Sequence, residues 1–332
     1  MKISLPSQLR LITDRNLIGD LENRMVEVEK RIKQATSHTD AMVNQMSSHL
    51  ANAGGKRIRP VLTLLTAKLG DCEAPHVLDA AVVMELTHIA TLYHDDVMDE
   101  APKRRGVDTA HTVWGNNIAI LTGDLLFARA SNIVSGLGEE ALLLQAQVFE
   151  QLVLGQLHES IGPKEGEDEL DHYIQVLKDK TGSLIALSAR LGALLSGADS
   201  KYQEPLQQFG EQIGVAFQLV DDIIDIQSTK EQSGKISGTD LLAGVPTLPV
   251  LLLKKHQDQD SRSLLDLIEN RMSQETLPAI LKQLRVHKVM AEAMEVTNKW
   301  ADSAISAISV LPDGSVKTAL VAFAKAVVDR KG

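Results

Sequence analysis

The sequence carries one acidic pentapeptide twice, and each copy ends an apolar helical pattern. The first copy reads DDVMD at residues 95–99, and the second reads DDIID at residues 221–225. On a helix, the first and fifth residues of such a copy lie one turn apart on the same face, with the second residue beside them. Three carboxylates therefore crowd one end of each helix, which restricts what the two helices can face.

Such crowding costs free energy unless a positive charge is bound. Two carboxylates about 6 Å apart repel by roughly 3 kcal/mol at an effective dielectric constant near 20, and the negative end of a helix dipole adds to this cost. Oxygen ligands of this kind suit Mg²⁺, which keeps several waters and is commonly completed by substrate phosphates. A solvated acidic patch is the alternative, and the repetition of the motif disfavours it. We predict that magnesium is held by six aspartates: Asp95, Asp96, Asp99, Asp221, Asp222 and Asp225.

Two basic segments supply the opposite charge. The segment GGKRIRP at residues 54–60 combines glycines, which allow close backbone approach, with Lys56 and Arg59 near an expected helix start. The segment KRRG at residues 103–106 follows the first aspartate motif directly, so arginine side chains are expected beside the metal. Alone, the first segment is typical of a solvated turn. Together with an acidic metal site, the two segments indicate a phosphate-bearing ligand.

Hydrophobic periodicity indicates an all-α protein. Apolar residues recur at three- or four-residue spacing, the pattern of an amphipathic helix, and no strand alternation competes with it. No stretch shows the change in composition of an interdomain linker, so we predict one domain over residues 1–332. The polar connection at residues 228–247 has the length of a lid or binding loop. The helical pattern covers residues 16–50, 75–99, 117–135, 139–161, 170–196, 203–227 and 286–309.

Charge and composition narrow the class of partner and the compartment. The formal net charge of -10 argues against a nucleic-acid-binding protein, which would present a basic face. Cys72 is the only cysteine, which excludes an intramolecular disulfide and is consistent with a reducing compartment. The chain opens without the apolar core of a signal peptide, and no apolar run approaches the roughly 18 to 20 residues of a membrane-spanning helix. We therefore expect a soluble, cytoplasmic protein.

These motifs resemble those of the trans-isoprenyl diphosphate synthase family, over roughly residues 50 to 250. The resemblance implies an all-α fold, a single large helical bundle with a central prenyl-binding cavity. It implies an Mg²⁺-dependent enzyme that elongates an allylic prenyl diphosphate with isopentenyl diphosphate, and a homodimer. The matching segments are GGKRIRP at 54–60, ELTHIATLYHDDVMDEAPKRRG at 85–106, LKDKTGSL at 177–184, FQLVDDIID at 217–225 and GKISGTDL at 234–241.

The resemblance also implies roles for individual side chains at the allylic diphosphate. The catalytic residues would be Asp95, Asp96, Asp99, Arg104, Lys180, Asp221, Asp222 and Lys235. The residues that face the allylic substrate would be Arg104, Lys180, Thr181, Gln218 and Lys235. Lys235 would arrive on the polar connection as part of a lid. Taken alone, Lys180 is more typical of a solvated surface, and Gln218 is equally typical of a satisfied core amide.

For isopentenyl diphosphate, the resemblance implies a site without metal. Its residues would be Lys56, Arg59, His88 and Arg105. His88 lies seven residues before Asp95, hence on the same helix face two turns away, although a lone helical histidine is usually a packing residue. The implied reaction is ionisation, condensation and elimination, and it requires no side-chain nucleophile.

Product length is partly predictable from the residues one turn before the first aspartate motif. Ala90 and Thr91 should line the floor of the cavity into which the prenyl tail grows, with Leu86 and Thr87 lying deeper. Family members with short products tend to carry bulky aromatic residues there. Two small side chains therefore predict a medium- or long-chain product, of the type used for a quinone tail. A shorter farnesyl or geranylgeranyl diphosphate is the alternative.

Three other functions remain open at this point. A class I terpene cyclase also ionises prenyl diphosphates on a helical scaffold, but it does not need the isopentenyl site. A di-metal carboxylate bundle would use the Glu-x-x-His spacing found at Glu85 and His88 and again at Glu169 and His172. A regulatory subunit or helical interaction protein would be expected to lack an aspartate motif. For the synthase, we expect a transient membrane association when product is released.

Overall fold

The computed structural model describes residues 14–228, 237–245 and 247–330, and helices dominate it. The predicted all-α class is confirmed. The helices of the first half are α1 Arg15–Thr36, α2 Ala41–Asn52, α3 Ile58–Ala67, α4 Val77–Met98, α5 Ala110–Trp114, α6 Asn116–Val134, α7 Glu139–Ile161 and α8 Glu169–Leu177.

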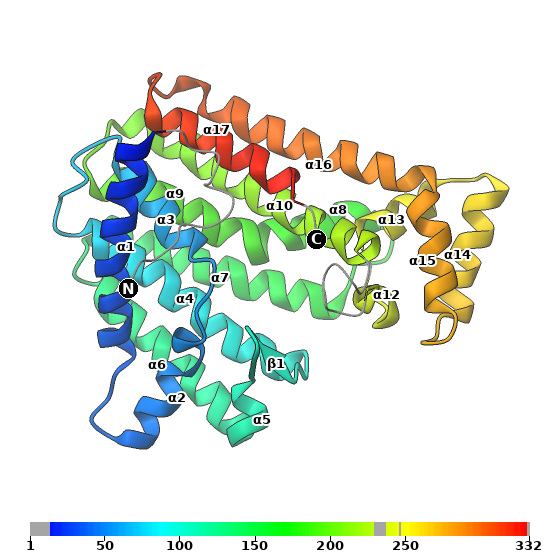
Figure 1. The fold of residues 1–332 in the computed structure, drawn as a ribbon, viewed down its shortest axis with the longest axis horizontal. Coiled ribbons are helices and arrows are strands. Elements are labelled where there is room, and N and C mark those ends of the chain that lie inside the picture. Colours follow the sequence, from blue (N-terminus) through cyan, green and yellow to red (C-terminus); the bar gives the residue numbers. More distant parts are fainter. Residues whose placement is uncertain (1–13, 229–236, 246, 331–332) are drawn as a thin grey trace.

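The second half continues the bundle and extends it at one end. A π-helical turn, Lys178–Gly182, joins α8 to α9 without a loop. The remaining α-helices are α9 Ser183–Leu195, α10 Gln203–Gln227, α12 Thr239–Leu242, α13 Leu248–Lys255, α14 Gln259–Arg271, α15 Leu277–Val286, α16 Lys288–Ala307 and α17 Ser315–Val328. Most long helices run along the long axis of the molecule, with α1 across one end and the pair α14 and α15 at the other (Figure 1).

Two local features differ from the periodicity of the sequence. The pattern over residues 16–50 is divided between α1 and α2, because Asp40 accepts hydrogen bonds from the backbone amides of Met42 and Val43 and so starts a new helix. After α4, β1 (Lys103–Arg104) pairs antiparallel with β2 (Val107–Asp108). The turn between them is formed by Arg105 and Gly106, which both have positive φ, as tight hairpin turns require.

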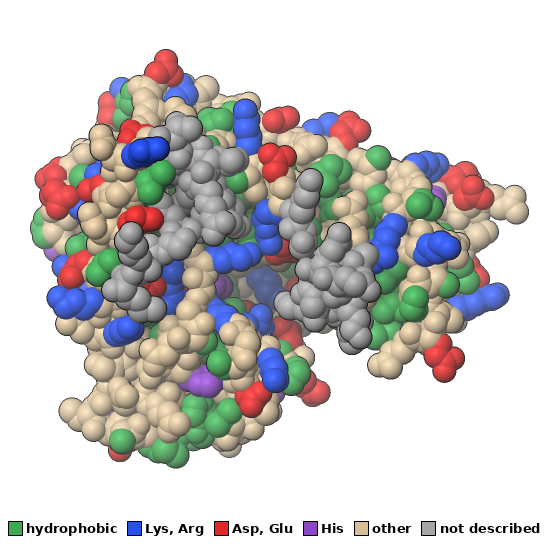
Figure 2. All heavy atoms as spheres, in the orientation of Figure 1, with side chains coloured by type: hydrophobic (Ala, Val, Ile, Leu, Met, Phe, Trp, Pro, Cys, Tyr) green, Lys and Arg blue, Asp and Glu red, His purple; other side chains and the backbone are tan. Residues whose placement is uncertain are grey.

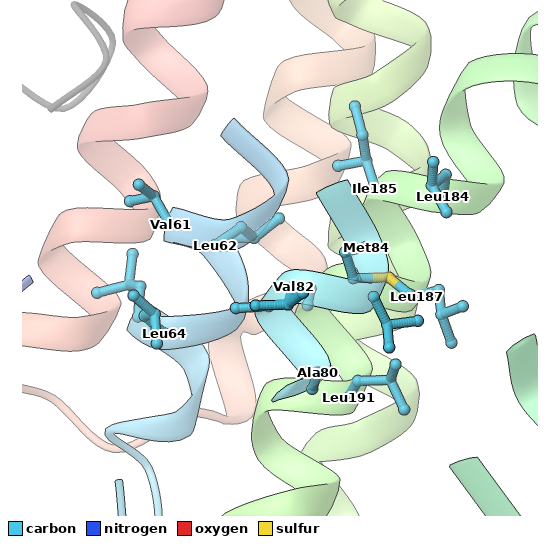
Figure 3. Packing of buried hydrophobic residues seen from close by; sticks show 14 of the residues in the cluster. Val61, Leu62, Leu64, Ala80, Val82, Met84, Leu184, Ile185, Leu187 and Leu191 are labelled. Carbon is cyan, nitrogen blue, oxygen red and sulfur yellow. The ribbon is translucent and has the colours of Figure 1, made fainter. Parts of the chain in front are cut away.

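The main core lies where α3, α4 and α9 pack against one another. Apolar side chains of the three helices meet between them, including Leu64, Met84 and Leu187 (Figure 3). Full burial of such a side chain stabilises the fold by about 1.5–3 kcal/mol. Gly192 permits the close approach of α9 to α3, since a Cβ there would lie 2.1 Å from the carbonyl oxygen of Thr63.

A second apolar cluster surrounds the C-terminal half of α10. It joins Val215, Leu219 and Ile223 of α10 to buried residues of α13, α15 and α16. The N-terminal half of α10, with Leu206 and Phe209, belongs to the main core. The helix that carries the second aspartate motif is therefore fixed on both sides, and the motif lies in its last two turns.

The first aspartate motif has the same setting on α4. This helix is buried along most of its length and becomes exposed only in its last turn and its cap, Asp99. Tyr93, one of its buried residues, donates a hydrogen bond to the carbonyl oxygen of Met46 at 2.5 Å and so anchors α4 to α2. Both motifs thus stand at the C-terminal ends of firmly packed helices.

Among the described helices, none combines the length and the apolar character that crossing a membrane requires.

Candidate active site

A cavity of about 500 Å³ opens where the start of α3, the C-terminal half of α4 and α10 approach one another. On the face shown in Figure 2, lysine and arginine side chains gather around a central hollow. The predicted site residues that line the cavity are Lys56, Arg59, His88, Asp95, Asp99, Arg104, Arg105, Lys180, Thr181 and Gln218. Segments that lie far apart in the sequence thus meet at one place.

The other predicted residues lie elsewhere. Asp96 is not among the residues that line the cavity and is only 1% exposed, with Oδ1 accepting a hydrogen bond from Nε of Arg104 at 2.6 Å. The three aspartates of the second motif are not among the residues that line this cavity in the described part of the chain. Lys235 lies outside the described residues, so its role as part of a lid stays a prediction.

Burial raises the pKa values of the first aspartate motif. The pKa of Asp95 rises to about 6, chiefly because the carboxyl group is desolvated, although the positive charge of Lys180 opposes the rise and the negative charge of Asp99 adds to it. The pKa of Asp96 is also raised by burial, against the hydrogen bond from Arg104. A carboxylate that resists ionisation in this way is stabilised by a nearby cation.

The second motif is hydrogen-bonded by its surroundings. The Tyr173 hydroxyl and the Leu248 amide both donate to Oδ2 of Asp222, the latter at 2.8 Å. Burial nevertheless raises the pKa of Asp222 to about 7. Asp225 accepts hydrogen bonds from the Thr239 hydroxyl at 3.2 Å and from the Asp240 amide at 3.3 Å. The start of α12 is therefore tied to the motif.

The donors of the two motifs fit a hard divalent cation. Oδ2 of Asp96 is buried and has no hydrogen-bond partner among the described residues. Asp95 and Asp222 hold their protons more tightly than ordinary carboxyls, chiefly because burial desolvates them, and neighbouring carboxylates add to the effect. As the described side chains stand, no three of the His, Cys, Asp and Glu residues form a complete cage. Mg²⁺ ordinarily takes only one or two carboxylates and completes its shell with water and phosphate oxygens.

The wall of the cavity that Arg59, His88 and Arg105 form is basic, and these side chains are partly buried. Burial lowers the pKa of Arg59 to about 10, with the charge of Arg105 contributing, while the charge of Glu85 opposes the shift. Arg105 donates to the carbonyl oxygens of Leu50, at 3.2 Å, and of Gly54. Burial, reinforced by the surrounding arginines, holds the pKa of His88 well below its usual range. His88 is therefore a neutral hydrogen-bonding group among cations.

Glycine is required where the basic segment passes over the hairpin. The backbone of Gly55 has φ +148°, and a Cβ there would lie 2.8 Å from Cζ of Arg105. No side chain could occupy that space without moving the guanidinium. The glycine pair noted in the sequence thus lets the backbone before α3 rest directly against an arginine of the site.

Lys180 and Thr181 owe their position to the π-helical turn. The extra residue of such a turn interrupts the regular helix, a feature frequently found at functional sites. The turn packs closely on α10, since a Cβ on Gly214 would lie 2.6 Å from Cα of Gly182. Nζ of Lys180 lies 2.5 Å from Oε2 of Glu159 on α7. Lys180 is thus an ion-paired residue of the cavity wall, not a solvated surface lysine.

Two residues at the site, Phe217 and Arg330, were not predicted from the sequence. Nη2 of Arg330, beyond the end of α17, lies 2.8 Å from Oδ1 of Asp221. The Arg330 guanidinium also lies 4.3 Å from the ring centroid of Phe217, and Nζ of Lys56 lies 5.5 Å from the same centroid. Phe217 precedes Gln218 within a matching segment, but its contact with two cations depends on the packing of three distant segments. The sequence around Arg330 contains no motif that would have assigned this residue to the site.

A second, mostly apolar cavity of about 390 Å³ lies beside the first, between α4, α6 and α7. Thr91 and Asp95 line it, and Phe127 of α6 and Phe149 of α7 lie with ring centroids 4.4 Å apart in its wall. Of the residues predicted to control product length, Thr91 lines this cavity. The other three are fully or almost fully buried in helix packing and are not among the residues that line this cavity: Ala90, Leu86 and Thr87.

Comparison with known proteins identifies the family. Residues 40–284 match the sequence profile of the family described as Polyprenyl synthetase. The chain belongs to this family. It is 42% identical over 310 residues to a nonaprenyl diphosphate synthase of Mycobacterium tuberculosis, with 93% of this chain and 92% of that protein covered. It is 30% identical to an octaprenyl diphosphate synthase of Escherichia coli, with 92% and 95% covered.

Solved structures of the family share the fold of this chain over nearly its whole length. A geranylgeranyl pyrophosphate synthase from Corynebacterium glutamicum, solved with calcium and isoprenyl diphosphate, superposes with a TM-score of 0.87 at 38% identity and covers 97% of this chain and 99% of its own. A decaprenyl diphosphate synthase from Rhodobacter capsulatus gives a TM-score of 0.85 at 29% identity, covering 95% and 98%. The family is metal-dependent.

The family membership confirms the predicted enzyme class: the chain is a polyprenyl diphosphate synthase, a transferase of prenyl groups. The two glutamates whose spacing suggested a di-metal bundle are each paired with a cation: Glu85 with Arg57 at 2.6 Å, and Glu169 with Lys254 at 2.7 Å.

Proposed function

We propose that this enzyme elongates an allylic prenyl diphosphate with isopentenyl diphosphate in trans and that it depends on Mg²⁺. The observation that supports this proposal is the mixed lining of one cavity. The carboxylates of Asp95 and Asp99 line it together with the partly buried cations Arg59 and Arg105. A terpene cyclase would need only the carboxylates.

The aspartate motifs would hold the metal: Asp95, Asp96, Asp99, Asp221, Asp222 and Asp225. When bound, Mg²⁺ supplies a Lewis acid at the departing diphosphate. Arg104 and Lys180 orient that diphosphate and stabilise the negative charge that develops when the bond between C1 and the diphosphate oxygen breaks. Thr181 and Gln218 line the same wall and position the allylic end. Lys235, outside the described residues, would close over it.

The basic wall would bind isopentenyl diphosphate without metal. Lys56, Arg59 and Arg105 supply positive charge, and His88, kept neutral by its surroundings, supplies a hydrogen bond that does not vary with pH near neutrality. The double bond of isopentenyl diphosphate attacks the allylic carbocation, a carbon–carbon bond forms, and a proton leaves to the released diphosphate. No side chain of the site needs to act as a nucleophile.

We propose a medium- or long-chain product that serves as a quinone side-chain precursor. The apolar cavity beside Asp95 gives the growing tail a dry path between α4, α6 and α7. The nonaprenyl and octaprenyl synthases among the relatives support this length. The geranylgeranyl synthase among the similar structures keeps the shorter product as the second candidate.

We also propose a homodimer that uses α6 and α7. These neighbouring helices expose large apolar side chains to an unusual degree, including Leu121 at 62%, Leu143 at 55% and Ile161 at 77%. Burial of such a surface is the usual basis of a stable subunit contact. We place the enzyme in the cytoplasm, with transient membrane association when the apolar product leaves. Sedimentation analysis tests the dimer: a monomer at micromolar concentration would contradict it.

One assay tests the function as a whole. Purified enzyme is incubated with Mg²⁺, labelled isopentenyl diphosphate and allylic starters of several lengths, and products are separated by chromatography. We expect label in a prenyl chain of defined length, no turnover with chelator, and at least about a 100-fold loss of turnover in Asp95→Ala. Absence of product with every starter, or wild-type turnover in Asp95→Ala, would overturn the proposal.

A further inference from the structure

A buried carboxylate stands at the basic wall of the cavity without a role in the proposed reaction. Glu85 of α4 is 1% exposed and lines the cavity together with Arg57, Arg59 and Arg105. Its Oε1 lies 2.6 Å from Nη1 of Arg57 and 3.7 Å from Nη2 of Arg105. Its charge also acts on the third arginine, Arg59, where it opposes the lowering of the pKa by burial. The negative charge of Glu85 thus acts on three guanidinium groups.

The three arginines differ in what else holds them. Arg57 is committed to the scaffold: its Nε lies 2.5 Å from Oε1 of Glu29 on α1, and its Nη2 donates to the carbonyl oxygen of Ala51 at 2.9 Å. Its backbone is left-handed, with φ 49°, so these contacts fix it in a conformation that is uncommon for a non-glycine residue. Arg57 is therefore an anchor, not a ligand-binding group.

The other two arginines are the ones available to a ligand. Nε of Arg59 is buried and has no hydrogen-bond partner among the described residues. Arg105 reaches backbone carbonyl oxygens through Nη1 and faces Glu85 through Nη2. Glu85 thus connects the fixed Arg57 to the two arginines that line the isopentenyl side of the cavity.

Without a negative charge beside them, the guanidinium groups of Arg59 and Arg105 would repel each other and would not keep their positions. Two guanidinium groups about 5 Å apart repel by roughly 3 kcal/mol at an effective dielectric constant near 20, and a buried charge left without a partner is strongly unfavourable. When no diphosphate is bound, Glu85 is the buried anion that faces these cations. A site held in its binding geometry in advance loses less free energy to ordering when its ligand arrives.

We propose that Glu85 is a positioning residue for isopentenyl diphosphate. Its carboxylate holds Arg59 and Arg105 in place before the ligand binds and so presets the metal-free diphosphate site. Glu85 itself touches neither the diphosphate nor the metal. The inference rests on the proposed function and deepens it, because it names what sets the affinity of one of the two substrate sites and leaves the other unaffected.

Steady-state kinetics of Glu85→Gln test the proposal. This variant keeps the shape and one acceptor oxygen but loses the charge. We expect KM for isopentenyl diphosphate to rise about tenfold, with kcat within about twofold and KM for the allylic starter unchanged, since only one site loses its preset geometry. Glu85→Asp keeps the charge one methylene further away, and we expect KM between those of wild type and Glu85→Gln.

Two further variants separate positioning from general stability. Glu29→Gln removes another partner of Arg57 that is not among the residues lining the cavity, and we expect a lower melting temperature with an unchanged KM for isopentenyl diphosphate. In the double variant Arg57→Met with Glu85→Gln, the net charge of the cluster is restored, and the carboxylate that loses Arg57 is Glu29, which is 21% exposed and so keeps contact with solvent. We expect its KM to stay raised, because Arg59 and Arg105 still lack their anion.

The outcomes separate this proposal from the proposed function. If wild type elongates the starter but Glu85→Gln keeps a normal KM, or if both substrates lose affinity equally, Glu85 does not position the isopentenyl site. A normal KM in the double variant would show that Glu85 only neutralises Arg57, which also overturns the proposal. If wild type forms no product at all, the proposed function fails, and this inference fails with it.

Discussion

Arg330 forms an ion pair with Asp221, the first aspartate of the second motif, with Nη2 and Oδ1 2.8 Å apart. The same guanidinium rests on the ring of Phe217, which also lies beneath Lys56 of the basic wall. The segment after α17 therefore places a cation on a carboxylate that we assign to the metal. Under this assignment, Arg330 and the metal would compete for Asp221 in the substrate-free enzyme.

We predict that Arg330→Gln binds Mg²⁺ more tightly when no substrate is present. Removing a competing cation from an aspartate should increase the affinity by about three- to tenfold, which corresponds to about 0.7–1.4 kcal/mol. Isothermal titration calorimetry of the substrate-free proteins measures the change. Arg271→Gln is the matched control, since Arg271 pairs with Asp266 at 3.7 Å on α14, away from the site. Equal affinities in Arg330→Gln and wild type would contradict the competition.

The burial of His88 predicts how stability depends on pH. Its pKa is held well below the usual 6.5 in the folded protein, so below pH 6.5 the unfolded chain binds a proton that the folded protein does not. The contribution of His88 to stability is complete above about pH 6.5 and is lost as the pH falls toward the lower folded pKa. We predict that the melting temperature of wild type falls more steeply between pH 6.5 and 5 than that of His88→Gln. Parallel slopes, measured by calorimetry, would show that His88 titrates normally.

The sequence predicts the parts of this structure that depend on local contacts better than the parts that depend on contacts between distant segments. The helical pattern of the sequence predicts α4, α6, α7, α10 and α16 to within a few residues. Most of these helices bury one face, whereas α4 is buried on nearly all sides. The pattern does not predict α13, whose short LPVLLL start is apolar on every face and shows no period. The π-helical turn is also missed, since its extra residue depends on packing against α10.

The same distinction applies to the site. The motifs place Asp95, Arg105 and Lys180 in one cavity, since each belongs to a segment whose local pattern is characteristic. The pairing of Arg330 with Asp221 could not be predicted, because no motif near residue 330 indicates which part of the protein this segment contacts. The role of Glu85 was hidden for a similar reason: its partners come from α1, the start of α3 and the hairpin.

Gly192 offers a direct test of the main core. A Cβ at this position would lie 2.1 Å both from the carbonyl oxygen of Thr63 and from Oγ1 of Thr66, so α9 and α3 must separate. We predict that Gly192→Ala lowers the free energy of unfolding by about 2 kcal/mol or more, as overpacking of a rigid core does. Gly19→Ala on α1 is the control: its Cβ would meet nothing within 4 Å, and we expect a gain of about 0.5–1 kcal/mol. Denaturant titration measures both, and comparable stability of the two variants would contradict this account of the helix packing.

The wall of the apolar cavity predicts which residues set the product length. Phe149 stands about two turns below Leu157 on α7, and Phe127 meets it from α6. His94 of α4 extends the aromatic group, with its ring centroid 5.6 Å from that of Phe127. These rings and Thr91 line the same cavity, so a tail that grows into this cavity would have to pass or displace them.

We therefore predict opposite effects of two substitutions. Phe127→Ala should lengthen the main product, because it opens the far end of the cavity, and Thr91→Phe should shorten it, because it fills the cavity one turn below Asp95. Products of labelled isopentenyl diphosphate are compared by reversed-phase chromatography at equal turnover. Ala90→Phe is the informative comparison, since Ala90 is fully buried in helix packing. A shorter product from Ala90→Phe would support the floor predicted from the sequence, whereas unchanged products from both Thr91→Phe and Phe127→Ala would show that the tail leaves by another route.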